Sequence, residues 1–167
     1  MKNTGVIRKI DELGRIVIPK EIRKNLNIRN GEDLQIFIEE DKIVLKKHQK
    51  MLSIKENAKR YIDSFSKLSS SKFLVTDKEK VIASSGNTIL DAKVDSLVIN
   101  LINDRKSGSG KGILFENNEL DSYYLVLPVI VDADAIGSVI VLSDKEVNEQ
   151  DKLLVSVIKI LLESLIY

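Results

Sequence analysis

A run of three apolar residues, Ile16-Val17-Ile18, constrains the fold of this chain more than any other feature of its sequence. Successive side chains of a β-strand face opposite sides of the sheet, so such a run needs cover from both sides. The run lies in a short first module that ends near residue 47. A unit of that size usually needs disulfides, metals or oligomerisation to be stable. We therefore expect a dimer in which two copies of the module share one core.

The first module combines alternating apolar residues with turn signals in a ββαββ order. Pro19 suits the first helical position, because its missing N–H would have no helical partner there. The predicted elements are strands at Val6–Asp11 and Arg15–Ile18 around a turn at Glu12-Leu13-Gly14, a helix from Pro19 that ends before Asn30-Gly31, and strands at Asp33–Glu39 and Ile43–Leu45 around a turn at Asp41-Lys42.

The rest of the chain has the pattern of a second, larger domain, and the predicted division is 1–50 and 51–167. Its predicted elements are a helix from Ser53 to Leu68, strands at Phe73–Thr76 and Val81–Ser84, a helix at Val94–Ile102, a Gly/Ser loop at Lys106–Lys111, strands at Ile113–Phe115, Tyr123–Val131 and Ala135–Leu142, and a helix at Val147–Tyr167. This order predicts an α+β domain with an antiparallel sheet. The apolar stripe of the last helix is wide enough to contact another subunit as well.

Charge is distributed unevenly between the two domains. Residues 1–50 hold 12 basic and 8 acidic residues, whereas residues 51–167 hold 14 and 17. A basic module joined to an acidic one indicates a head that binds a polyanion and a separate body.

Six basic residues of the opening segment are the candidate binding residues. They are Arg8, Lys9, Arg15, Lys20, Arg23 and Lys24. Pairing of the first two strands would bring Arg8 and Arg15 together, and a dimer would double the set. Such a face could neutralise the phosphates of duplex DNA, and arginine can also bind guanine edges with two hydrogen bonds. A solvated basic surface is the alternative that charge alone leaves open.

Residues Gly5–Leu26, with the sequence GVIRKIDELGRIVIPKEIRKNL, and the following Ile28 and Gly31-Glu32 closely resemble the AbrB-type swapped-hairpin DNA-binding domain. Within that family, the segment IDELGRIVIPKEIR is most similar to the sequences of the two-domain sporulation regulators. The resemblance implies a β-barrel in which hairpins from two chains interleave. It also implies that residues matching Arg8, Arg15, Arg23 and Lys24 carry DNA binding. Relatives often have arginine where this chain has Lys24, and lysine lacks the two-pronged guanidinium.

A second resemblance covers Tyr124–Val131 and Ala135–Ser143, which are similar to a strand pair of GAF domains. It implies a GAF-like C-terminal domain. Two roles stay open for such a domain, namely sensing a small-molecule ligand of unknown identity and oligomerisation, since a fold alone does not establish a ligand.

Other features argue against catalysis, metal binding and membrane insertion. The chain has no cysteine, and its one histidine, His48, lies between polar residues without partners for a site. Residues Ser107–Gly112 lack the spacing of a phosphate-binding loop, and the carboxylates are scattered. We therefore expect no enzyme, cofactor or metal. Leu153–Ile166 is too short and too polar to span a bilayer, and the N-terminus lacks a secretory signal.

These observations together predict a homo-oligomeric, sequence-selective regulator of transcription, as the resemblance implies, that acts on sporulation genes from the cytoplasm at the nucleoid. The GAF-like domains would couple dimers into a tetramer. Two alternatives remain. One is an antitoxin, since swapped-hairpin heads also occur in antitoxins, and the other is a ligand-binding signalling module whose basic head only dimerises.

Overall fold

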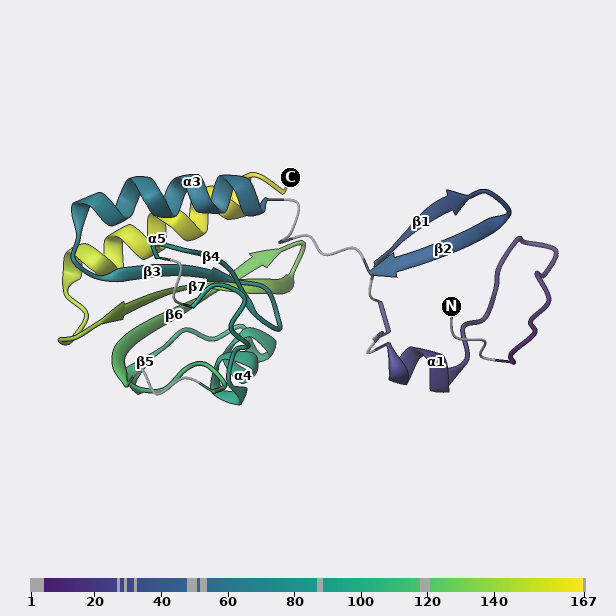
Figure 1. Ribbon diagram of the computed structural model, residues 1–167, viewed down its shortest axis with the longest axis horizontal. Coiled ribbons are helices and arrows are strands. Elements are labelled where there is room, and N and C mark those ends of the chain that lie inside the picture. The colour runs from purple at the N-terminus through teal and green to yellow at the C-terminus, as the bar shows by residue number, and fades with distance from the viewer. Residues whose placement is uncertain are drawn as a thin grey trace. The chain divides into compact units, whose positions relative to one another are not determined.

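The structure is a computed structural model, which describes residues 5–26, 28, 30–31, 33–47, 51, 54–86, 89–117 and 121–166. The chain forms two compact units, Met1–His48 and Gln49–Tyr167, and Figure 1 shows the elements of each.

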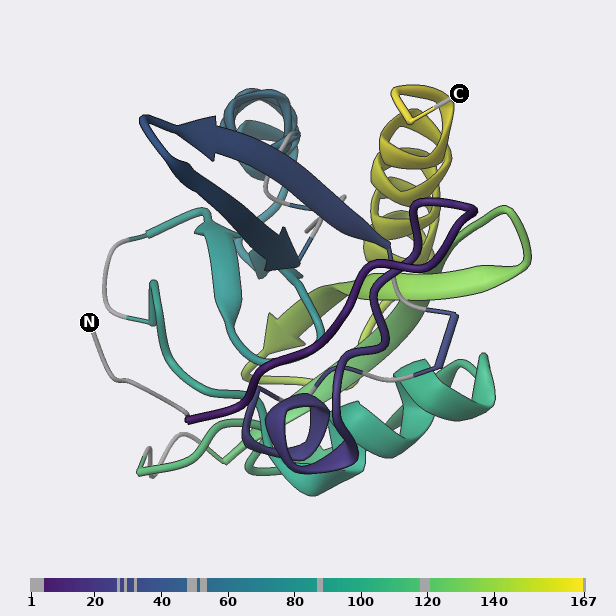
Figure 2. The ribbon, with the colours of Figure 1, turned by 90° about the vertical axis from the view of Figure 1, so that its right-hand side faces the viewer.

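The larger unit is built on one five-stranded antiparallel sheet with the strand order β4-β3-β7-β6-β5. The strands are β3 (Lys72–Thr76), β4 (Val81–Ser84), β5 (Gly108–Gly112), β6 (Ser122–Val131) and β7 (Asp134–Ser143). Helices α3 (Lys55–Phe65) and α5 (Glu149–Ser164) cover one face, and α4 (Ser96–Asp104) covers the other (Figures 1 and 2). A single 3-10 turn, Ser66–Leu68, follows α3. The predicted α+β class with an antiparallel sheet is confirmed.

Both faces of this sheet are packed. One apolar cluster fills the space under α3 and α5 and includes Ala58, Val129 and Ile158. A second cluster lies under α4 and includes Val98 and Ile140. Strand β7 lies in the centre of the sheet and is buried along nearly its whole length, which accounts for its continuous apolar sequence.

The two later helices start where side chains cap them. Asp95 accepts a hydrogen bond from the backbone N–H of Leu97 at 2.9 Å, and Asn148 accepts one from the N–H of Asp151 at 2.8 Å. Such caps satisfy N–H groups that lack a partner within the helix. The predicted helices at 94 and 147 therefore begin two residues later than their apolar patterns indicate.

The prediction for residues 106–115 is wrong in part. The expected Gly/Ser loop contains strand β5, and the expected strand Ile113–Phe115 contributes only one isolated bridge, between Phe115 and Val94. Close packing explains the glycines of β5. A Cβ on Gly108 would lie 2.6 Å from Cδ1 of Leu101, and a Cβ on Gly110 would lie 3.1 Å from the hydroxyl of Tyr124. Glycine thus lets this edge strand approach α4 and β6.

The smaller unit contains helix α1 (Lys20–Asn25) and an antiparallel hairpin of β1 (Leu34–Glu39) and β2 (Lys42–Lys47). This hairpin confirms the last two predicted strands of the module. Helix α1 is shorter than predicted and ends well before Gly31, whose positive φ of 78° forms part of the following turn.

The first two predicted strands, Val6–Asp11 and Arg15–Ile18, are wrong for a single chain. Residues 5–19, all of which the structure describes, contain no strand and run as an open loop (Figure 1). The turn between them does form, because the N–H of Gly14 donates to the carbonyl of Asp11 at 2.9 Å. A strand exists only when a second strand pairs with it, and one chain offers these residues no such neighbour.

The smaller unit has no buried core of its own. None of residues 5–26, 28, 30–31 and 33–46 is buried. Ile7 is 92% exposed and Val17 is 74% exposed. One face of the β1–β2 hairpin is apolar, since Ile36 pairs with Leu45 and Ile38 with Ile43, and all four side chains are exposed. This unit therefore presents an apolar surface that its own described residues leave uncovered.

Candidate nucleic-acid interface

The six candidate cations lie on two neighbouring segments of the smaller unit. Arg8, Lys9 and Arg15 lie on the loop of residues 5–19, and Lys20, Arg23 and Lys24 lie on α1. Five of them are exposed, and Arg23 is half-buried. The first two strands do not pair in one chain, so a single chain lacks the strand pairing that was expected to bring Arg8 and Arg15 together.

Arg15 is held by Asp11 across the turn. Its Nε donates to Oδ2 of Asp11 at 2.8 Å, and its backbone N–H donates to Oδ1 at 2.8 Å. The same Oδ1 accepts from the N–H of Leu13 at 3.0 Å. The backbone and side-chain hydrogen bonds from Arg15 favour the carboxylate form and so lower the pKa of Asp11.

Arg23 is held by Asn30 at the other end of the α1 region. One terminal nitrogen, Nη1, donates to Oδ1 of Asn30 at 2.6 Å. The backbone of Arg23 is fixed as well, because its N–H donates to the carbonyl of Pro19 at 3.0 Å and its carbonyl accepts from Ile28 at 2.7 Å. Its Nε is buried without a hydrogen-bond partner among the described residues.

The other four cations differ from these two arginines. Within the described part of the chain, the side chains of Arg8, Lys9, Lys20 and Lys24 have no hydrogen bond or ion pair. Sequence reasoning missed Asp11 and Asn30 as partners. The pair of Asp11 and Arg15 could have been predicted, because an acidic residue lies four positions before an arginine across a turn. Nothing in the sequence indicates the pair of Arg23 and Asn30.

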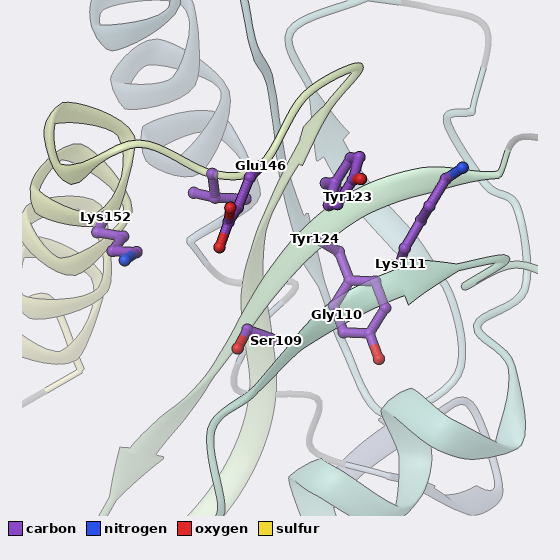
Figure 3. A pocket seen from close by; sticks show the side chains of 8 residues that line it. Ser109, Gly110, Lys111, Tyr123, Tyr124, Glu146 and Lys152 are labelled. Atoms are coloured by element: carbon purple, nitrogen blue, oxygen red, sulfur yellow. The ribbon is translucent and has the colours of Figure 1, made fainter.

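Among the described residues of the larger unit, a pocket with a volume of about 230 Å³ lies beside strands β5 and β6 (Figure 3). Ligand pockets usually enclose about 300–1,000 Å³. The two lysines of the pocket already form ion pairs. Nζ of Lys111 lies 3.3 Å from Oδ2 of Asp121, and Nζ of Lys152 lies 2.7 Å from Oε1 of Glu149. The eight residues that line it are Ser109, Gly110, Lys111, Tyr123, Tyr124, Glu146, Val147 and Lys152.

The described residues contain no group of three or more histidine, aspartate or glutamate side chains placed to hold a metal ion. Among the same residues, no helix has both the length and the apolar character needed to cross a membrane.

Two family models match the chain in succession. Residues 53–162 match the family described as stage V sporulation protein T C-terminal, transcription factor. Residues 7–53 match the family described as antidote-toxin recognition MazE, bacterial antitoxin.

Three known proteins illustrate the similarity. Stage V sporulation protein T of Bacillus subtilis is 34% identical over 152 residues, covering 86% of this chain and 85% of the relative. The N-terminal DNA recognition domain of the Bacillus subtilis regulator AbrB is 52% identical, covering 29% of this chain and 91% of the domain, with a TM-score of 0.26. The type II free methionine-R-sulfoxide reductase of Thermoplasma acidophilum is 16% identical, covering 71% and 95%, with a TM-score of 0.53. This last likeness shows the fold alone.

Proposed function

The chain belongs to the family of stage V sporulation protein T, the AbrB-type sporulation transcription factors, and from this premise we propose that it binds duplex DNA as a swapped-hairpin dimer. The observation that carries the proposal is the combination found in the smaller unit. Its apolar side chains lie uncovered in one chain, and its six candidate cations lie on two adjoining segments. The protein would act in the cytoplasm at the nucleoid, on the promoters of sporulation genes.

The uncovered apolar surface supports the dimer. Burying one isoleucine, leucine or valine side chain stabilises a protein by roughly 1.5–3 kcal/mol. The smaller unit leaves Val6, Ile10, Ile36, Ile38 and Ile43 exposed. A second copy presents the same surface and can cover them about a two-fold axis. In that dimer the segments Val6–Asp11 and Arg15–Ile18 acquire the strand neighbours that they lack in one chain, and the two hairpins form a β-barrel.

The charges of the same unit support DNA as its partner. Each lysine or arginine that neutralises a phosphate releases counterions, so the logarithm of the affinity falls with the logarithm of the salt concentration by about 0.9 per contact. Arg8, Arg15, Arg23 and Lys24, with Lys9 and Lys20 beside them, give each copy six cationic side chains from which such contacts can be drawn. A two-fold dimer would double this set on one face.

We propose that the GAF-like unit joins dimers into a tetramer rather than senses a ligand. Two apolar clusters fill both faces of its sheet, and the pocket on its surface is small for a ligand. Leu153 and Ile160 on the outer side of α5 are exposed and available to another subunit. Two linked heads on one DNA molecule would bind more tightly than either head alone.

An antitoxin is the second candidate, because residues 7–53 match an antitoxin family. The compact unit at Gln49–Tyr167 argues against it, because this segment packs as a domain. Purification of the chain from its native cell in a stable complex with a toxin would favour the antitoxin function over the regulator.

The proposal can be tested by titrating the full-length chain into a fluorescent duplex at several salt concentrations. We expect binding that weakens steeply with salt, and a weaker, less salt-dependent complex for Arg8→Gln. Lys67→Gln is the matched control, since it removes one charge from the turn after α3 of the other unit, and it should bind like the wild type. A wild-type chain that binds no duplex at low salt would overturn the proposal.

A further inference from the structure

The six cations divide into two arginines that are held in place and four side chains that have no hydrogen bond or ion pair within the described part of the chain and are here called unanchored. We propose that Asp11 and Asn30 are positioning residues, which orient Arg15 and Arg23 to read base edges, while Arg8, Lys9, Lys20 and Lys24 contact phosphates. The inference rests on the proposed DNA binding and goes beyond it by dividing the surface into residues that select the sequence and residues that bind any duplex.

The geometry at Arg15 carries the first half of the inference. A guanidinium group has five N–H donors in a planar fork. Asp11 takes the Nε–H, so the two terminal nitrogens of Arg15 stay available to bind the O6 and N7 atoms of a guanine. Both side chains are exposed, and exposed ion pairs add little to stability. The contribution of this pair is therefore the orientation of the arginine.

Arg23 repeats the arrangement with a neutral partner. Asn30 accepts one N–H of Nη1 at 2.6 Å, and the Nε of Arg23 is already buried. The remaining N–H groups of Nη1 and Nη2 are left for a base edge. An arginine that is already oriented loses less conformational freedom on binding than a flexible one. Its hydrogen bonds also fit one arrangement of acceptors, which is the requirement for discriminating between bases.

The four unanchored cations fit the opposite task. Phosphates recur along every duplex, and contacts to them fix the position of a protein without reading the sequence. Long side chains without fixed partners can follow a phosphate backbone of any sequence. Lys24 fits this class in a second way, because a lysine ammonium binds as a point charge rather than as a fork.

The Asp11→Asn substitution removes the side-chain contact that orients Arg15 but keeps the hydrogen bonds that form the turn. The asparagine Oδ1 can still accept from the N–H groups of Leu13 and Arg15, so the turn is kept. Its amide nitrogen replaces Oδ2 and cannot accept the Nε–H of Arg15. The substitution also removes a negative charge from the DNA-binding face. The expected signature is therefore a lost preference for sequence without a lost affinity for DNA in general.

The test uses the full-length chain and two duplexes. One is recovered from a randomised pool by selection with the wild-type protein, and the other is a shuffled duplex of the same base composition. We expect Asp11→Asn to lower the ratio of the two affinities by about tenfold or more, with equal or tighter binding to the shuffled duplex. Asn30→Ala should also lower the ratio of the two affinities. Asn30→Asp keeps an oxygen that can accept the hydrogen bond from Nη1 of Arg23, so its ratio should stay close to that of the wild type. Lys9→Gln should weaken both complexes by the same factor.

An unchanged ratio in Asp11→Asn, or an equal loss on both duplexes, would overturn the inference while leaving the proposed DNA binding in place. Arg15→Lys, which keeps the charge but not the fork, supplies the same readout if Asp11→Asn does not fold. Equal affinity of the wild-type chain for both duplexes would overturn the inference that Arg15 and Arg23 read the sequence, while the proposed DNA binding would stand. A chain that binds neither would overturn the proposed function itself.

Discussion

Single positions in this protein are fixed by close contacts that only a small or a polar residue can satisfy. Gly137 on β7 is the tightest of them. A Cβ at this position would collide with the carbonyl oxygen of Thr76 and lie 3.1 Å from both the Cα of Asp77 and the Cγ of Met51. Met51 is itself buried, so Gly137 lies where the chain enters the larger unit. Backbone atoms that belong to a paired strand cannot move aside easily.

Gly137→Ala should therefore destabilise the larger unit by about 1–3 kcal/mol, the usual cost of overpacking. Urea unfolding followed by circular dichroism measures the change. Gly86→Ala is the matched control, because a Cβ at Gly86 would meet no atom of the described residues within 4 Å. Equal stability of the two variants would contradict the packing described at Gly137.

The ion pair of Asp11 with Arg15 predicts a pH dependence. The hydrogen bonds from Arg15 hold the pKa of Asp11 below its ordinary value of 3.8. A carboxyl whose folded pKa is lowered contributes its stabilisation above the unfolded value and loses it as the pH falls through the folded value. The turn should therefore stay ordered at pH 5 and loosen only in stronger acid. Carboxyl chemical shifts of Asp11 followed by NMR measure this, and titration at or above 3.8 would contradict it.

At the scale of elements, helix α5 is joined to the sheet at an irregularity in strand β6. The register of β6 against β7 shifts between Val129 and Ile130. Oε1 of Glu163 accepts the N–H of Ile130 at 2.7 Å and lies 2.8 Å from Nζ of Lys159. A helix side chain thus satisfies a strand donor next to the shift in register, and it fixes the position of α5 along the sheet.

Glu163→Ala should destabilise the larger unit by about 1–3 kcal/mol, because it leaves the partly buried N–H of Ile130 without an acceptor. Glu163→Gln keeps an acceptor oxygen and should cost less. Thermal unfolding measures both variants, with Glu149→Ala as the control, since the Glu149 side chain is exposed and pairs only with Lys152 within the described residues. A Glu163→Ala variant as stable as the control would rule out this role.

The elements also show how far sequence reasoning reaches. Local signals were sufficient to predict the hairpin of β3 and β4 and the presence of α4, because both follow from apolar patterns among neighbouring residues. They did not give the start of α4, which the cap at Asp95 sets at Ser96. They failed at β5, whose glycines are typical of a loop. The glycines are needed in this strand because Leu101 and Tyr124 lie against it, and these contacts are not visible in the local sequence. Local signals also could not reveal that Asn30 holds Arg23, a contact made across a turn.

For the whole molecule, the sequence predicted an AbrB-type unit followed by a GAF-like unit. The family models that match residues 7–53 and 53–162, and the similarity to stage V sporulation protein T, confirm a two-domain regulator of that family. The strands predicted at Val6–Asp11 and Arg15–Ile18 are a different case. Their apolar pattern is that of paired strands, yet one chain gives them no neighbour. The apolar pattern of these two segments thus fits strands that pair in an oligomer and not the fold of a single chain.

Ile38→Glu should separate the dimer into chains whose larger unit remains folded. Ile38 is 81% exposed in one chain and lies on the apolar face of the hairpin, where a charge in the shared core would lack a partner. Gln35→Glu places the same charge on the opposite face and should leave the dimer intact. Sedimentation velocity measures both variants. The same oligomer for Ile38→Glu as for the wild type would contradict the shared core.

In the proposed dimer, two chains share one core in the unit that carries the basic residues. Hydrogen–deuterium exchange of the full-length wild-type protein measures whether that core forms. We expect slow exchange at Val6–Asp11 and Arg15–Ile18, because in the dimer their backbone N–H groups bond to neighbouring strands. Fast exchange throughout residues 5–19, at concentrations where the protein sediments as an oligomer, would contradict the proposed dimer.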